Sequence, residues 1–368
     1  MQLAKPVSVS SLRFLDEYQF PGKQVLDTSV IGGLSGIDYD AKKNIYYLIC
    51  DDPSAYGPAR FYTAEIRIDD VKIDTMVFTS MVPLLDARGQ RYPDIRKDRV
   101  HSADVEAMRY NPRTRQLIRS TEGQRAQGPM KTQFQQPEVV IMDIQGRFRD
   151  TFRLPANFRI DSMEKGPRHN SVFEGLTFRN DYREILVAVE DALYDDGPRA
   201  ATGDSSAWSR IAAFDLKSRK QVAQYAYPLS PVPKVPVPAS AFKVNGVTDL
   251  LWIGSSNYLV IERAWSTGTM TCQVKLWLAD FSNATDVSGI ASLSSQRPLG
   301  PEEQETSFRP IRKKLLLDFD TLGRDIYNIE GMTLGPKLSN GRQSIFFVVD
   351  DNFNDRERNQ LLMFEIVP

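Results

Sequence analysis

Acidic residues recur in this sequence at a spacing that would bring several carboxylates together. Glu122 follows Glu106 by 16 positions, and Glu190 follows Glu174 by the same interval. The first acid of each pair opens one short apolar run, and the second acid ends another. Antiparallel neighbours place the start of one strand beside the end of the next, so the acids should meet at one sheet edge. An oxygen-rich cluster suits calcium, which takes roughly six to eight oxygen ligands.

The same pair of strands is predicted five times along the chain. Ser35 and Asp51 are again 16 positions apart, whereas Glu330 and Asp350 are 20 apart. A weaker copy joins Asp249 to Glu262 over 13 positions. A unit repeated at this scale cannot bury its own faces and must stack against its neighbours. Zinc is a poorer candidate than calcium, because the chain has only two histidines and two cysteines.

The elements that position these acids are predicted to be strands, four to a repeat. One strand is missing after the last repeat and one is spare before the first, so an N-terminal strand would complete the last sheet. We therefore expect an all-β fold: a single β-propeller domain over residues 1–368, with about five four-stranded blades. A six-bladed propeller is the alternative, because the irregular insertion at 282–309 could contain an additional hairpin. The proline-rich loop at 228–238 is interpreted as a lid or rim element.

The repeated acids would converge at one mouth of such a propeller, where cations or protons must neutralise them. The predicted metal ligands are the acids of the repeats: Asp51, Asp52, Glu106, Glu122, Glu174, Glu190, Asp191, Glu330, Asp350 and Asp351. The alternative is that each carboxylate caps a turn or accepts backbone amide bonds and binds no metal.

Basic residues precede three of the acids at matched distances. His101 and His169 each lie five positions before an acid, where a histidine could donate a proton. Arg99, Arg168 and Arg324 lie six or seven positions before an acid, where an arginine could clamp a phosphate or carboxylate. The alternative for the histidines is a polar loop residue that pairs with a neighbouring acid.

Charge and hydropathy exclude several classes of partner. Lys plus Arg (46) nearly balances Asp plus Glu (47), which gives no sign of nucleic-acid binding. No apolar run reaches the roughly 18 residues of a membrane span. We expect a monomer that acts on a small molecule, with Cys50 and Cys272 as free thiols. The first ten residues lack the apolar core of a secretion signal, so either the protein stays in the cytoplasm or a leader precedes this sequence.

Several of these motifs resemble a known family. The run Asn328-Ile329-Glu330-Gly331-Met332-Thr333-Leu334-Gly335-Pro336, with Val348-Val349-Asp350-Asp351-Asn352-Phe353, is similar to the C-terminal signature of phytase-like proteins described as having esterase-like activity. Asp104-Val105-Glu106-Ala107 and Phe173-Glu174-Gly175-Leu176 resemble the internal motifs of that family. The resemblance implies a propeller, six-bladed by analogy with propeller phytases. It also implies a metal-dependent phosphoesterase and an extracytoplasmic location, periplasmic or secreted. Ala107, Ser35 and the run Thr248-Asp249-Leu250 depart from the pattern.

Three functions follow as hypotheses. The first is a calcium-dependent hydrolase of phosphate esters, in which Glu174, Glu330, His169 and His101 are the catalytic candidates. The second is a metal-dependent hydrolase of another ester or a lactone. The third is a non-catalytic binding or scaffold propeller whose acids serve only the structure.

Overall fold

The computed structural model describes residues 6–20, 24–126, 133–203, 207–294, 308–354 and 356–368. These residues form five four-stranded antiparallel sheets, two short two-stranded ribbons and brief 3-10 turns. The chain is therefore an all-β propeller of five blades, as the repeat predicts. It divides into two compact units, residues 1–122, 138–151 and 323–368 in the first and residues 123–137 and 152–322 in the second.

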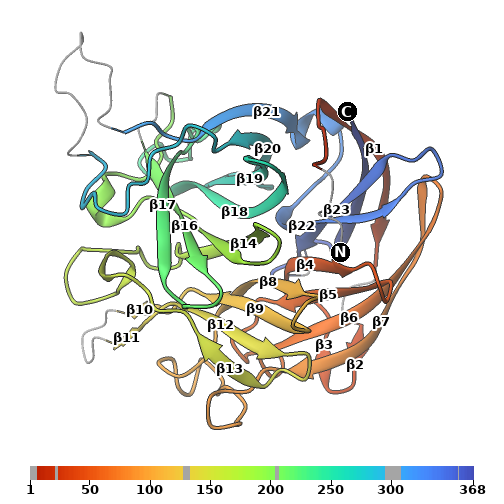
Figure 1. The fold of residues 1–368 in the computed structure, drawn as a ribbon, viewed down its shortest axis with the longest axis horizontal. Coiled ribbons are helices and arrows are strands. Elements are labelled where there is room, and N and C mark those ends of the chain that lie inside the picture. Colours follow the sequence, from red (N-terminus) through yellow and green to blue (C-terminus); the bar gives the residue numbers. More distant parts are fainter. Residues whose placement is uncertain (1–5, 21–23, 127–132, 204–206, 295–307, 355) are drawn as a thin grey trace. The chain divides into compact units, whose positions relative to one another are not determined.

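The first unit contains three of the sheets (Figure 1). Their strands, in sheet order, are β4 (Leu34–Asp40), β5 (Ile45–Cys50), β6 (Arg60–Asp69) and β7 (Lys72–Pro83); then β8 (Val105–Asn111), β9 (Gln116–Thr121), β12 (Glu138–Asp143) and β13 (Phe148–Thr151); then β22 (Asn328–Lys337), β23 (Gln343–Asp350), β24 (Gln360–Val367) and β1 (Ser11–Gln19). A short ribbon joins β2 (Val25–Leu26) to β3 (Ser29–Val30).

The last of these sheets confirms the predicted closure by the N-terminal strand. β1 runs antiparallel to β24, with Ser11 opposite Val367 and Gln19 opposite Gln360. Arg13 also donates to the Glu365 carboxylate at 2.8 Å. The strand that is spare at the start of the sequence thus supplies the strand that is missing at its end, and β24 is not left as an open edge.

The second unit contains the other two sheets. Their strands are β14 (Phe173–Arg179), β15 (Glu184–Val189), β16 (Trp208–Asp215) and β17 (Gln221–Pro228); then β18 (Lys243–Gly254), β19 (Asn257–Ser266), β20 (Gln273–Asp280) and β21 (Arg312–Asp318). The sequence pattern missed the ribbon of β10 (Gln124–Ala126) and β11 (Gln133–Gln135). Among the described residues of this unit, 3-10 turns lie at η1 (Ala156–Phe158), η2 (Tyr194–Asp196) and η4 (Phe319–Leu322).

The burial pattern differs between strands of one sheet. In β5, residues 46–50 are all buried, as expected of a strand that is covered on both faces. In β6, Ala64 and Ile66 are buried whereas Glu65 and Arg67 are exposed. This alternation marks a strand with one face in water. Cys50 and Cys272 are both free thiols, as predicted.

The irregular segments of the second unit are tied to its sheets. Val232 of the proline-rich loop is buried and bridges to Thr202, whereas Val235 and Val237 are exposed. The described part of the 282–309 insertion contains no strand, and residues 295–307 lie outside the described residues. Buried Arg210 binds Asp196 through two hydrogen bonds, at 2.6 and 2.8 Å, and also donates to the carbonyls of Val287 and Ile290. This buried ion pair therefore anchors the insertion to β16.

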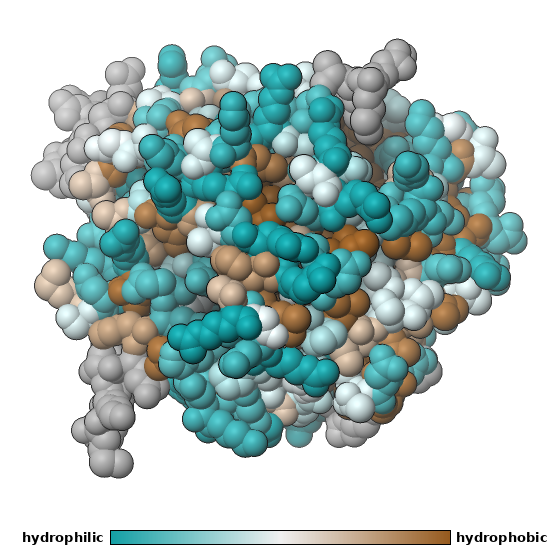
Figure 2. All heavy atoms as spheres, turned by 60° about the horizontal axis from the view of Figure 1, so that its bottom comes forward, coloured by the Kyte–Doolittle hydropathy of each residue, from teal (hydrophilic) through white to brown (hydrophobic). Residues whose placement is uncertain are grey.

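The face drawn in Figure 2 carries mostly hydrophilic side chains with smaller apolar patches between them. In the part of the chain that the structure describes, no helix has the length and apolar character needed to cross a membrane.

Candidate functional site

Three inner strands of the first unit, β22, β4 and β8, lie side by side (Figure 1). A Cβ atom at Gly331 would lie 2.8 Å from the Gly36 Cα and 3.1 Å from the Ile37 nitrogen. Buried Arg109 of β8 donates from Nη1 to the carbonyls of Ile37, at 2.5 Å, and Met332, at 3.1 Å. The glycine after the repeated acid thus permits a close approach, and one guanidinium connects all three strands.

Each inner strand has a break in register at the repeated acid position. The break falls between Leu34 and Gly36 in β4 and between Ile329 and Gly331 in β22, which leaves Ser35 and Glu330 as the extra residues. In β8 it falls between Val105 and Met108, where Glu106 and Ala107 lie. Such a β-bulge changes the direction of a side chain. The bulges are the local devices that position these acids, and the alternation of apolar residues did not reveal them.

The bulges also show that two residues of the weaker repeat were matched to the wrong positions of the other repeats. In β18 the register breaks between Val247 and Asp249, so Thr248 occupies the position of Glu330, and Asp249 is one residue further on. Val247 pairs with Glu262 as Ile329 pairs with Val349, so the counterpart of Asp350 is Arg263. The pattern had matched Asp249 and Glu262 instead, because a shift of one residue cannot be seen without the strand register.

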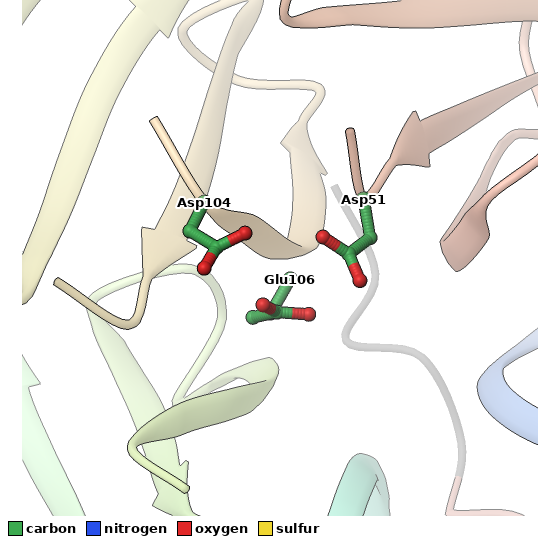
Figure 3. A group of neighbouring side chains, drawn as sticks. All are labelled: Asp51, Asp104 and Glu106. Atoms are coloured by element: carbon green, nitrogen blue, oxygen red, sulfur yellow. The ribbon is translucent and has the colours of Figure 1, made fainter. Parts of the chain in front are cut away.

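Three carboxylates of the first unit lie together. Asp51 follows β5, Asp104 precedes β8 and Glu106 lies at the bulge of β8. One oxygen from each lies within 4.8 Å of the others, and Figure 3 shows the three side chains around a common space. Glu106 is 6% exposed and Asp104 is 9% exposed. Asp104 was absent from the predicted ligands, although it stands two positions before Glu106 in the motif.

More acids of the same unit act on this group. Desolvation and the negative charges of Asp104, Asp350, Glu330 and Glu122 raise the pKa of Asp51 well above its usual value. Burial and the charge of Glu330 likewise raise the pKa of Asp350. We define the unit 1 acidic cluster as Asp51, Asp104, Glu106, Glu122, Glu330 and Asp350.

The second acid of each Asp-Asp pair has a different role. Asp52 accepts hydrogen bonds from the Ala55 amide at 2.6 Å and the Tyr56 amide at 3.0 Å, and its Oδ2 binds Arg60 at 2.6 Å. Asp351 accepts from the Gly33 amide at 2.8 Å and the Asn359 side chain at 2.8 Å. These contacts match the alternative in which an acid organises a loop.

Two of the three predicted acids of the second unit form ion pairs with arginines. Glu190 pairs with Arg263 at 2.8 Å, and Asp191 pairs with Arg199 at 2.6 Å. Burial nevertheless raises the pKa of Asp191 to about 6. Glu174 is a buried residue of β14, at a bulge between Phe173 and Leu176. The metal-binding roles of these three acids stay predictions.

The predicted basic residues lie on loops. In the first unit His101 is exposed and its Nδ1 lies 2.9 Å from Asp98, as the alternative reading expects, and Arg324 binds Glu17 at 3.2 Å. Arg99 is exposed. In the second unit His169 is exposed, whereas Arg168 donates to the carbonyls of Ala192 and Gly197. Their catalytic and substrate-binding roles stay predictions.

The donor set of the unit 1 acidic cluster fits a calcium ion. It offers only carboxylate oxygens, which come from short loops and bulged strands of three sheets and can adopt unequal angles. Burial and then the negative charges of neighbouring acids raise the pKa of Asp51, and a divalent cation would offset that repulsion.

Several solved structures resemble this chain at low sequence identity. Glucose dehydrogenase is 11% identical, with a TM-score of 0.38 over 96% of this chain and 99% of that one. Hydrazine synthase from Kuenenia stuttgartiensis is 9% identical, with a TM-score of 0.36 over 93% and 98%. β-Fructofuranosidase from Schwanniomyces occidentalis is 8% identical, with a TM-score of 0.41 over 97% of this chain and 64% of that one. These scores support no functional argument.

No curated protein matches the sequence. The family model described as phytase-like, with esterase-like activity of phytase, matches residues 29–353. This span runs from the strand before the first repeat to the loop after β23, and so includes all five bulged inner strands. The chain therefore belongs to the phytase-like family.

Proposed function

We propose that this protein is a calcium-dependent hydrolase of phosphate esters that acts at the unit 1 acidic cluster. The observation that carries the proposal is the approach of Asp51, Asp104 and Glu106 to within 4.8 Å, with Glu122, Glu330 and Asp350 close enough to raise the pKa of Asp51 or Asp350. Membership of a family described by the esterase-like activity of phytase supports this reaction class.

In this proposal Asp51, Asp104 and Glu106 would hold the ion. Bound calcium would supply positive charge for an anionic phosphate and would favour ionisation of a bound water. The chain contributes the position of the ligands: the β8 bulge directs Glu106, and the Ser35 hydroxyl fixes the adjoining backbone by donating to the Glu106 carbonyl at 2.5 Å. Asn328 donates to Glu330 at 2.9 Å and so orients a second inner-strand acid.

The first experiment is a calorimetric calcium titration of chelator-stripped protein, with a thermal melt in parallel. We expect saturable binding and a higher melting temperature, because an ion bound only to the folded state stabilises it. Glu106→Gln should weaken calcium affinity by about tenfold, equivalent to roughly 1.4 kcal/mol, and should lower the turnover of a phosphate ester. Glu65→Gln on β6, whose side chain is half exposed, is the matched control and should change neither. The proposal is wrong if calcium produces neither heat nor stabilisation.

The contacts of Asp52, Asp351, Glu190 and Asp191 favour a second candidate, a non-catalytic binding propeller. Four predicted ligands organise loops or pair with arginines, as acids with a structural role do. This candidate predicts no turnover of any ester, and only a stability change in Glu106→Gln. A screen at fixed calcium that includes phosphate esters, carboxylic esters and lactones separates the candidates.

A further inference from the structure

Two aromatic side chains stack on loops that follow two acids of the unit 1 acidic cluster. The rings of Tyr56 and Phe353 have centroids 4.5 Å apart and an interplanar angle of 18°. Tyr56 lies on the loop that begins with Asp51, and Phe353 lies on the loop that begins after Asp350. Both rings therefore come from chain segments that leave the cluster directly.

The Phe353 ring lies against the segment that leads into β4. A Cβ atom at Gly33 would lie 2.6 Å from Phe353 Cε2 and 2.9 Å from the Asp51 carbonyl. Gly33 has a φ of 61°, and its carbonyl accepts from the Asp51 amide at 2.6 Å. Phe353 thus packs where the backbones of Asp51 and Gly33 meet.

The second acids of the two Asp-Asp pairs hold this aromatic pair in place. Asp52 accepts from the Tyr56 amide, and Asp351 accepts from the Phe353 amide at 3.2 Å. Phe353 has a φ of 50°, a left-handed conformation that a bulky residue rarely adopts without support from its surroundings. The Arg60 guanidinium, bound to Asp52, also lies 5.8 Å from the Phe353 ring centroid.

Tyr56 is nevertheless open to solvent. Phe353 covers one face of its ring, yet 58% of the residue is exposed. The loop beneath it is fixed, because Ser54 Oγ donates to the Tyr92 carbonyl at 3.1 Å and Arg96 donates to the Ala55 carbonyl at 2.8 Å. An exposed aromatic ring on a fixed loop loses little conformational entropy when a second ring stacks on it.

We propose that Tyr56, supported by Phe353, is a stacking platform for the ring of an aryl phosphate whose phosphate lies at the unit 1 acidic cluster. This inference rests on the proposed function and specifies its substrate class. A planar ring gains from offset stacking on a tyrosine, whereas a small aliphatic alcohol does not. Substrates with an aromatic leaving group should therefore be preferred over glycerol phosphate.

The test compares the binding of phenylphosphonate and methylphosphonate, which are not hydrolysed, to the calcium-loaded full chain by calorimetry. We expect phenylphosphonate to bind roughly three- to tenfold more tightly. Tyr56→Ala should remove this preference and leave methylphosphonate binding unchanged. Tyr56→Phe, which keeps an aromatic ring, should retain the preference for phenylphosphonate. Val77→Ala, at an exposed apolar residue of β7 in the same unit, is the control and should have no effect.

Kinetics supply a second readout. Tyr56→Ala should raise the KM for p-nitrophenyl phosphate with little change in kcat, and should leave both constants for glycerol 2-phosphate unchanged. The platform is overturned if wild type binds both phosphonates equally, or if Tyr56→Ala weakens both alike. Calcium binding with turnover but no aryl preference would reject only the platform. Absence of calcium binding would reject the proposed function and the platform together.

Discussion

At the scale of single residues, the repeated acids differ in role because their neighbours differ. Asp51 and Asp350 lie among other carboxylates, and burial together with the negative charges of those neighbours raises the pKa of each. Asp52 and Asp351, one position later, accept backbone amides and organise loops. The chemical role of each acid therefore depends on the partners that the fold supplies.

The raised pKa of Asp51 predicts the pH dependence of the metal-free protein. A carboxyl whose pKa is higher in the folded than in the unfolded state binds more protons when folded, so stability falls as pH rises from its ordinary value of 3.8. In chelator, this group should therefore lower the melting temperature as the pH rises above 3.8. The Asp51→Asn variant should lose less stability as the pH rises. At pH 8 its melting temperature should therefore exceed that of wild type by about 1–3 °C.

Saturating calcium should flatten this pH dependence in wild type, because the cation neutralises the cluster. Thermal melts with and without chelator measure both effects. If the melting temperature in chelator rose steadily with pH, the raised pKa of Asp51 would be contradicted.

At the scale of elements, the inner strands combine a bulge with a close backbone approach. The bulge directs the acid, and the following glycine lets the neighbouring strand come near, as Gly175 does beside Asp249 in the second unit. A Cβ at Gly175 would lie 2.7 Å from the Asp249 Cα, which is backbone and cannot rotate away. The glycine of the Glu-Gly motif is thus a packing requirement.

Gly331→Ala should therefore destabilise the protein. The added methyl would lie 2.8 Å from the Gly36 Cα, and relief of such overlap by backbone shifts costs about 1–3 kcal/mol. Gly289→Ala is the matched control, because a Cβ there would meet no atom within 4 Å. Urea denaturation of both variants measures the difference. Equal stability of the two would show that the strands can separate without cost.

At the scale of the whole molecule, the first and last strands of the chain belong to one sheet. Ser11 lies opposite Val367, and the Ser10 amide donates to the Val367 carbonyl at 2.8 Å. This pairing joins residues from both ends of the sequence and so has a high cost in loop-closure entropy. The stability of the first unit should depend on it.

A disulfide between these strands tests that dependence. The double variant Ser11→Cys with Val367→Cys should, when oxidised, unfold at a higher temperature than when reduced, because the cross-link restricts the unfolded chain. Cross-links that close long loops contribute about 2–4 kcal/mol. The reduced protein is the internal control, and both buried Cys50 and partly exposed Cys272 stay free thiols. Identical melting of the two forms would contradict the predicted contribution of this pairing to stability.

The sequence by itself determined the fold class and the closing strand, whereas the choice between five and six blades needed the structure, which has five four-stranded sheets in its described residues. Period-two alternation and a repeated spacing depend only on local geometry, which each strand expresses in the same way. The same pattern brought Asp51, Glu106, Glu122, Glu330 and Asp350 to notice as candidate ligands.

Only the tertiary structure decided which acids face other acids. Arg263 binds Glu190, which lies 73 positions away in the sequence. Because of the one-residue bulge in β18, Thr248 and not Asp249 occupies the position of the repeated acid. Neither effect can be predicted from sequence periodicity, because contacts between distant segments set the strand register and the partner of each charged residue. Asp104 joined the cluster for the same reason: its place before β8 becomes meaningful only when Asp51 is brought beside it.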